Sequence, residues 1–156
     1  METALNQQIN AELWSAYLYL SMSCDMEDKG YEGFASWFKL QAKEEYEHAT
    51  RFMKFISERG GKINLMPIEK VKQEWVSPQD AFAETLKHEK VITEYIHNLM
   101  EIAVELKDYA TQSLLRWFID EQVEEESTAA NILEKLKRIE NSPAGLYALD
   151  HALGKR

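Results

Sequence analysis

The stretch GKINLMPIEKVKQEWVS, residues 61–77, decides the fold, because it separates two long helical regions without being helical itself. Gly60 and Gly61 lie where it begins, Pro67 interrupts it and Pro78 follows it. These seventeen residues span about 56 Å when extended, whereas a helix of about 27 residues is only about 40 Å long. The segment can therefore run the whole length of a helical bundle and leave the helices on its two sides parallel.

The rest of the chain is predicted to be helical. Only six Gly and three Pro occur in 156 residues, and they cluster between segments rich in Ala, Leu, Glu, Lys and Gln. The predicted helices span residues 3–28, 32–60, 78–106, 109–140 and 144–153. Short turns join the first helix to the second and the third to the fourth, so each pair is antiparallel. The sequence predicts one all-α domain over residues 1–156: a four-helix bundle with one long crossover and a short fifth C-terminal helix.

The overall composition argues against several classes of function. The net charge is −9, from 27 acidic and 18 basic residues, and no Lys/Arg-rich patch occurs, so we expect no nucleic-acid partner. An acidic protein attracts cations instead. Cys24 is the only cysteine, which excludes an intrachain disulfide and a zinc-type Cys cluster and fits a reducing cytoplasm. Neither a signal peptide nor a run of eighteen apolar residues is visible, so we expect a cytoplasmic protein without membrane association.

Each of the four long helices has an apolar stripe with the 3.6-residue period of a core-facing helix. Residues of these stripes include Leu5, Ile9, Phe34, Phe38, Phe52, Phe82, Leu86, Ile92, Leu114, Phe118 and Ile132. Every stripe is interrupted near its middle by polar side chains. The interruptions are Glu12 in the first helix, Gln41, Glu45 and His48 in the second, Glu89 in the third, and Gln122 and Glu125 in the fourth.

The interruptions also lie at similar heights along the bundle. Counted from the short turns at Gly30 and Asp108, the four glutamates and His48 lie 15 to 19 residues away. In antiparallel helix pairs equal counts mean equal heights, and the differences amount to about one helical turn. We therefore expect four carboxylates and one imidazole to meet at one level of the core.

Four carboxylates so close together would repel one another and could not all stay ionised. Two divalent cations would neutralise them, and oxygen ligands with one imidazole suit Fe(II), Mn(II) or Zn(II). A structural polar network is the alternative interpretation, and a lone His48 would more often be a hydrogen-bonded core histidine. Its spacing from Glu45, on the same helix face, favours the metal site.

Three further residues near the stripes are interpreted separately. His88 points about 100° away from its neighbour Glu89 and is expected to be solvated. Tyr19 lies on the same helix face as Glu12, and a core role and a role at the site both stay open. Trp117 is expected to be a packing residue and not part of the site.

Four stretches resemble those of the bacterial non-haem ferritins. They are NAELWSAYLYLSM from residue 10, WFKLQAKEEYEHATRF from residue 37, HEKVIT from residue 88 and WFIDEQVEEE from residue 117. The resemblance covers the whole chain and implies a ferritin-like bundle with a ferroxidase centre. It implies Fe(II) and O2, or H2O2, as substrates, and a hollow homo-oligomeric shell of twenty-four subunits in which iron is stored as a mineral.

The resemblance also implies roles for individual residues. Glu12, Glu45 and His48 would hold one iron, and Glu45 would bridge to a second iron held by Glu89 and Glu125. Gln122 would hydrogen-bond near the second iron, and Tyr19 matches the tyrosine beside the centre of these ferritins. A third iron site would be formed by Glu44, Glu121 and Glu124, with a contribution from Glu125. The alternative is that these glutamates form an ordinary solvated acidic face.

Two differences from related families argue against other members of the ferritin-like group and against a haem. The fourth helix has Gln122-x-x-Glu125 in place of a second Glu-x-x-His motif, which argues against bacterioferritin and rubrerythrin. Tyr46 occupies the position of the haem-ligating Met of bacterioferritin, so no haem is expected. The alternative functions are a di-iron oxidase or peroxidase of the rubrerythrin type and a metal-free structural helical bundle.

The resemblance also implies assembly contacts. Part of a twofold subunit contact would come from the crossover, whose apolar residues are Ile63, Leu65, Met66, Ile68, Val71 and Trp75. The fifth helix would line fourfold channels. Its stripe of Leu146, Leu149 and Leu153 is equally compatible with a tail that packs on its own bundle.

Overall fold

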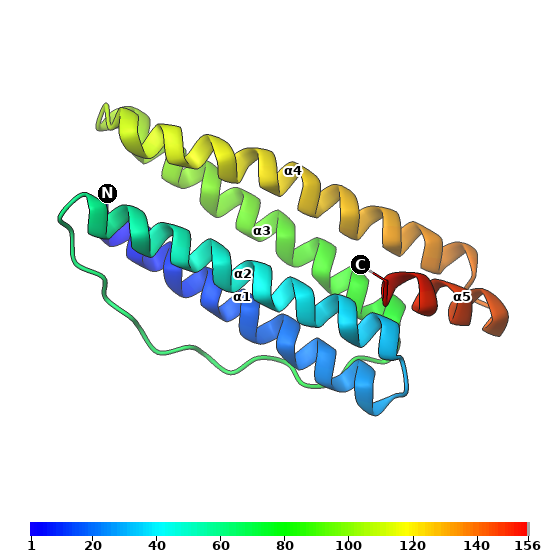
Figure 1. Cartoon of the computed structure of the whole chain (residues 1–156). Helices are drawn as coiled ribbons and strands as arrows, with labels where there is room; N and C mark the ends of the chain where they lie inside the picture. The colour runs from blue at the N-terminus through cyan, green and yellow to red at the C-terminus, as the bar shows by residue number, and fades with distance from the viewer. Residues whose placement is uncertain (156) are drawn as a thin grey trace.

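The computed structural model describes residues 1–155, which form five helices and no strand. They are α1 (Glu2–Asp28), α2 (Glu32–Glu58), α3 (Pro78–Glu105), α4 (Tyr109–Arg138) and α5 (Pro143–Leu153). The four long helices form a bundle, and α5 lies across the end at which α2 begins (Figure 1). All five predicted helices are confirmed, with ends that differ from the predicted ones by no more than two residues.

The helix ends follow the local sequence signals. Ser77, Asp108 and Ser142 each accept a hydrogen bond at their side chain from a backbone N–H three residues later, which satisfies a donor that the first helical turn leaves free. Gly30 and Gly60 follow the ends of α1 and α2 with φ values of +79° and +73°. A side chain is strained in this left-handed region, so glycine is the natural residue at both turns.

The crossover between α2 and α3 runs along the outside of α1 and is attached to it by side chains of α1. Asn6 Nδ2 donates to the Lys62 carbonyl at 3.0 Å. Ser21 Oγ donates to the Lys72 carbonyl at 2.7 Å. Because these contacts proceed from the first turns of α1 towards its last, the crossover spans the bundle and α2 and α3 are parallel, as predicted (Figure 1).

The apolar residues of the crossover divide into two groups. Val71 and Trp75 are 5% and 2% exposed and pack into the core of their own bundle. Ile63, Leu65 and Ile68 are 37%, 64% and 44% exposed, respectively. The second group, together with Val76, which is 91% exposed, therefore offers apolar surface for a contact with another subunit.

The core consists of two apolar clusters with a polar layer between them. One cluster, near α5, includes Phe34, Phe38 and Phe82, and the other includes Phe52 and Phe118. Each fully buried aromatic side chain contributes about 1.5–3 kcal/mol of hydrophobic stabilisation. Together the two clusters hold the four helices rigidly on both sides of the polar layer.

The short helix α5 packs on the bundle through the stripe predicted from the sequence. Leu146, Leu149 and Leu153 are half-buried against the cluster near α5. The carboxylate of Asp150 accepts a hydrogen bond from the backbone N–H of Phe34 at 2.9 Å. A Cβ on Gly33 would lie 1.7 Å from the Asp150 carbonyl oxygen, so only glycine permits this approach.

Candidate metal centre

The five residues predicted to share one level of the core do lie in one buried layer. Glu12 comes from α1, Glu45 and His48 from α2, Glu89 from α3 and Glu125 from α4. Their exposed fractions lie between 1% and 8%. We call this set the carboxylate layer. Four acidic side chains withdrawn so far from water need compensating partners, and their partners differ from one side of the layer to the other.

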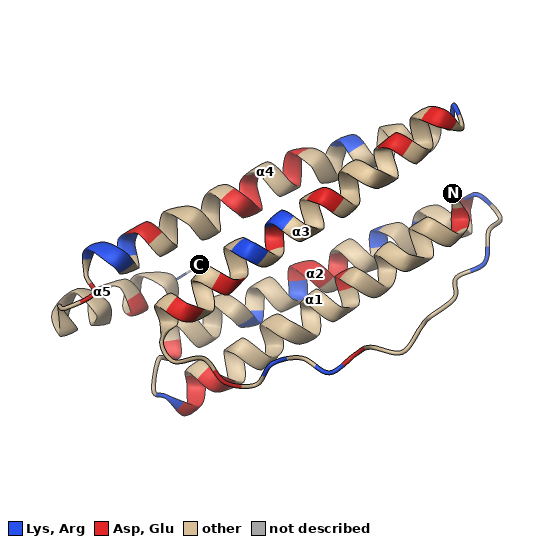
Figure 2. Cartoon of the chain, turned by 180° about the vertical axis from the view of Figure 1, so that it is seen from behind, with Lys and Arg blue, Asp and Glu red and all other residues tan. Residues whose placement is uncertain are grey.

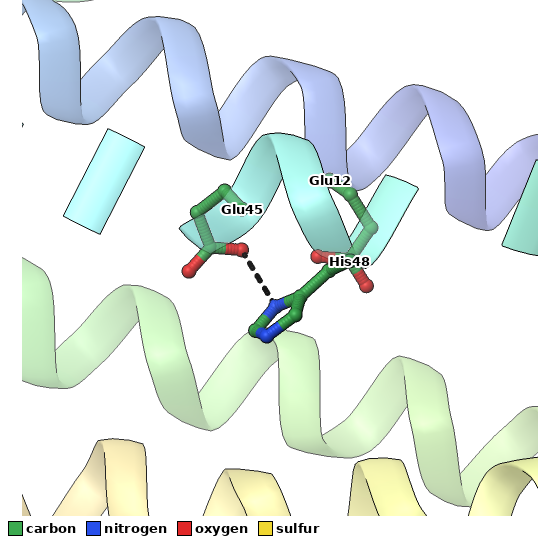
Figure 3. Close-up of side chains that lie close together, drawn as sticks. All are labelled: Glu12, Glu45 and His48. Atoms are coloured by element: carbon green, nitrogen blue, oxygen red, sulfur yellow. Dashed lines mark ion pairs between the residues drawn. The ribbon is translucent and has the colours of Figure 1, made fainter. Parts of the chain in front are cut away.

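The first half of the layer consists of Glu12, Glu45 and His48. These three residues offer ligand atoms that all lie within 4.8 Å of one another. Figure 3 shows the carboxylates of Glu12 and Glu45 on either side of the imidazole, with Glu45 Oε2 3.5 Å from His48 Nδ1. The i, i+3 spacing on α2 places the last two side chains on one helix face.

One oxygen of the first half has no hydrogen-bond partner. Gln8 Nε2 donates to Glu12 Oε1 at 2.8 Å, but Glu12 Oε2 accepts from no donor. Among the buried side-chain nitrogen and oxygen atoms of residues 1–155, it is the one without a partner. An orphaned buried oxygen is costly, and beside a second carboxylate and an imidazole it is what a metal ligand requires.

The second half of the layer consists of Glu89 and Glu125, and it is saturated with donors. The Tyr19 hydroxyl donates to Glu89 Oε1, and Gln122 Nε2 lies 3.2 Å from Glu89 Oε2. Gln41 Nε2 donates to Glu125 Oε2 at 2.7 Å. Tyr19 therefore lies beside the carboxylate layer, and because it is fully buried it also belongs to the core.

Burial raises the pKa of every carboxyl group in the layer. For Glu12 and Glu45 the pKa lies well above its usual value, first because of burial and then because of neighbouring carboxylates. For Glu89 and Glu125 burial raises the pKa to about 7. Gln41 also donates to Glu45 at 3.4 Å, and the charges of Glu89 and Glu125 act on Glu45. Glu45 thus connects the two halves electrostatically.

The aromatic surroundings fix the imidazole. The rings of Trp117 and Phe118 meet His48 edge-on, with centroids 5.5 Å and 5.8 Å away. The guanidinium carbon of Arg51 lies 3.8 Å from the centroid of the Trp117 ring. Trp117 therefore has the packing role that the sequence predicted, and its packing partner is His48.

The outer acidic residues come together only in part. Glu121 is half-buried and offers a ligand atom within 4.8 Å of those of His48 and Glu125. The charge of Glu44 raises the pKa of Glu125, which places Glu44 near the same point. Glu124 is exposed on α4. The grouping of Glu121 with His48 was not anticipated from the sequence.

The expectation that His88 is solvated was wrong. It is half-buried, its Nε2 lies 2.7 Å from Ser15 Oγ, and its ring packs against Trp14 and Tyr19. The cause is α1, which covers the side of α3 that carries His88. Burial lowers the pKa of His88 to about 4, so the imidazole is neutral at neutral pH.

Comparison with known proteins identifies the family. The family model of the ferritin-like domain matches residues 2–139. The chain belongs to the ferritin family. Its similarity extends over nearly the full length of curated ferritins: 42% identity to the bacterial non-heme ferritin of Bacteroides fragilis (strain 638R), over 100% of this chain and 97% of that protein. Identity to the bacterial non-heme ferritin of Staphylococcus aureus (strain USA300) is 39%, over 98% and 92% of the two chains.

Solved ferritins have the same fold as this ferritin. An open pore ferritin from the hyperthermophilic archaeon Archaeoglobus fulgidus superposes with a TM-score of 0.99 at 46% identity, covering 100% of this chain and 96% of that one. A closed form of the Archaeoglobus ferritin, engineered by site-directed mutagenesis, also gives 0.99. The ferritin-like bundle with one crossover and a short C-terminal helix is therefore confirmed. Among residues 1–155, no helix is both long and apolar enough to span a membrane.

Proposed function

We propose that this ferritin stores iron and that its carboxylate layer is a ferroxidase centre that oxidises Fe(II). The observation that carries the proposal is the buried layer itself, in which Glu12 Oε2 lacks any partner. Without a cation the layer gathers four carboxylates whose pKa values are all raised, and two divalent ions would remove that repulsion. Membership of the ferritin family makes Fe(II) the cation of choice.

The proposed ligand assignment follows the two halves. One Fe(II) is held by Glu12, Glu45 and His48, and the other by Glu45, Glu89 and Glu125. The two Fe(II) ions give one electron each to O2, which takes up two protons and becomes H2O2. With H2O2 as the oxidant, the same two electrons and two protons yield two waters. Hard carboxylate ligands favour the Fe(III) product, which then passes to the mineral.

Three side chains support this chemistry without holding iron in the centre. Tyr19 and Gln122 hold the Glu89 carboxylate from two sides, which fixes its orientation toward the second iron. Gln41 donates to both Glu45 and Glu125 and so ties the halves together. No haem is part of the proposal, since Tyr46 occupies the position of the haem-ligating Met of bacterioferritin.

A third iron site belongs to the proposal as well. Glu44, Glu121 and Glu124, with Glu125, would bind a further iron beside the second half. The proximity of Glu121 to Glu125 and the effect of the Glu44 charge on Glu125 support it. Replacing Glu124 by Ala should leave two irons bound per chain and change the turnover or the stoichiometry of oxidation. If crystals soaked in Fe(II) show only two iron positions at every loading, the third site is refuted.

The central experiment replaces the carboxylate that both metals share. Glu45→Ala should slow the initial rate of Fe(II) oxidation in air by about 100-fold or more, because losing a shared ligand exceeds the 10–100-fold effect of losing an outer partner. Glu101→Ala, which changes an exposed glutamate of α3 about three turns from Glu89, is the control and should oxidise like the wild type. An unchanged initial rate in Glu45→Ala, with assembly intact, contradicts the ferroxidase assignment.

We further propose that the protein assembles as a hollow cytoplasmic shell of twenty-four subunits, held partly by the exposed part of the crossover. Leu65 and Ile68 are 64% and 44% exposed, and an obligate interface would bury such apolar surface. The double variant Leu65→Glu, Ile68→Glu should give small helical species by light scattering that bind metal but store no mineral. Lys70→Gln in the same segment should leave the shell intact. A full shell formed by the double variant would show that other surfaces hold the subunits together.

A further inference from the structure

A groove of about 660 Å³ lies between α1 and α3 and carries no charged side chain. Its walls are formed by apolar and uncharged polar side chains, which include Ala11, Trp14, Val91, Tyr95, Asn98 and His88. Figure 2 shows why this is unusual: the ribbon of α1 is free of charged residues over most of its length, although the chain has a net charge of −9. In residues 3–24 of α1, Glu12 is the one charged residue, and it is buried.

The groove reaches the carboxylate layer at Gln8. Gln8 lines the groove, is 3% exposed, and donates to Glu12 Oε1 at 2.8 Å. Glu12 in turn has its second oxygen without a partner. The amide of Gln8 therefore lies between the groove and a carboxylate of the first half.

A second groove approaches the layer from the opposite side, between α2 and α4, and its character is the reverse. His48 of the layer lines it, together with the acidic residues Glu44, Glu47, Glu58 and Glu121. Its other lining residues include Arg51, Lys54 and Trp117. Acidic side chains along a path to a metal site attract cations, whereas a path without acidic side chains provides no negative charge to compensate a cation for the loss of its hydration shell.

We propose that the α1–α3 groove binds the uncharged oxidant, O2 or H2O2, and delivers it to the centre, while Fe(II) arrives through the α2–α4 groove. This inference rests on the proposed ferroxidase function. Small neutral oxidants partition into apolar clefts without a desolvation penalty for charge, and the amides of Gln8 and Asn98 add hydrogen-bond donors that H2O2 can use. Separate routes let the oxidant and the two irons meet only at the layer.

The test fills each groove with a bulky side chain and measures the apparent KM for the oxidant and for Fe(II). Ala11→Phe and Val91→Phe fill the α1–α3 groove from its two walls, and Thr50→Phe, which lines the α2–α4 groove, is the matched control. Apparent KM values for O2, for H2O2 and for Fe(II) are measured by stopped-flow absorbance. Co(II) absorption titrations of each variant report whether the centre still folds and binds metal.

We expect each α1–α3 variant to raise the KM for the oxidant by about fivefold or more, with the KM for Fe(II) and the Co(II) affinity unchanged. Thr50→Phe should raise the KM for Fe(II) only. A rise for O2 alone or for H2O2 alone identifies which oxidant uses the groove. Unchanged oxidant KM values in both filled variants, with Co(II) binding intact, overturn the inference. A wild type that oxidises Fe(II) with neither oxidant instead refutes the proposed function itself.

Discussion

The two halves of the carboxylate layer are built from the same kinds of residue but are compensated differently. In the first half, Glu12 keeps an oxygen without a partner and His48 supplies a nitrogen ligand. In the second half, Glu89 and Glu125 are both held by donors from Tyr19, Gln122 and Gln41. The imidazole of His48 belongs to the first half, although one of its ring nitrogens also lies within 4.8 Å of a Glu125 oxygen. The first half is thus incomplete without a cation, whereas the second half is closer to satisfied.

Under the proposed function, the two irons should therefore not be equivalent. A cation in the first half gains an imidazole and relieves an orphaned oxygen, so it should bind first and stay. A cation in the second half gains mainly carboxylates, which already accept hydrogen bonds, so it should bind more weakly and exchange more readily. In the proposed function, such a weaker site would release Fe(III) to the mineral more easily.

The largest effect on metal affinity is expected when a ligand of one half is removed by mutation. His48→Ala should weaken the tighter step of Co(II) binding by about 100-fold, because a ligand is lost rather than an outer partner. Glu125→Ala should remove the weaker step and leave the tighter step in place. Absorption titration of the metal-free protein measures both. Equal losses of both steps in both variants would show that the halves bind as one unit and would break the comparison.

A smaller effect is expected from the donor that serves only the second half. Tyr19→Phe removes the hydroxyl that holds Glu89 Oε1 but keeps the buried ring. The weaker Co(II) step should lose about tenfold in affinity, because outer-shell hydrogen bonds orient ligands, and the tighter step should not change. Tyr17→Phe, an exposed tyrosine on the same helix, is the control. A loss of Co(II) affinity confined to the tighter step would show that Tyr19 supports the first half of the layer and not the second.

The smallest expected effect is on the stability of the metal-free protein. Burial raises the pKa of Glu125 to about 7 in the folded state, from 4.5 for an exposed glutamate. A raised carboxyl pKa contributes stability that is fully present below about 4.5 and is lost as the pH rises through about 7. Glu125→Gln carries no charge at any pH, so its advantage over the wild type should grow from pH 5 to pH 8.

The expected gain at pH 8 is on the order of 1 kcal/mol or more in the free energy of unfolding, measured by urea denaturation in the presence of a chelator. Glu124→Gln, which neutralises an exposed carboxylate of the same helix, should show no such trend. A difference between Glu125→Gln and the wild type that is constant between pH 5 and pH 8 would mean that Glu125 ionises normally in the folded protein.

The height of the carboxylate layer could be predicted because it depends only on the number of residues between each polar side chain and the nearest turn. Helices joined by short turns are antiparallel, so Glu12 and His48, each eighteen residues from Gly30, must lie level. The crossover was predictable for a similar reason, since its length alone allows it to span the bundle. Fold and candidate ligands therefore followed from periodicity, chain length and the position of the turns.

The features that the sequence did not reveal depend on how closely two helices approach. His88 was expected in solvent, but α1 covers it and Ser15 lies 2.7 Å from its ring nitrogen. Gln8 lies one turn before Glu12, a spacing that allowed a hydrogen bond without requiring one. Val71 and Trp75 could have faced another subunit as easily as their own core. Such contacts depend on helix rotation and spacing, which a periodic pattern does not specify.

The most direct test of the central claim is anomalous diffraction from crystals soaked in Fe(II) without oxygen, at increasing iron concentration. We expect iron to bind first between Glu12, Glu45 and His48, and a second iron to bind at Glu89 and Glu125, with Glu45 in contact with both. Iron found only among the exposed acidic residues, with the carboxylate layer free of metal at every concentration, would contradict it.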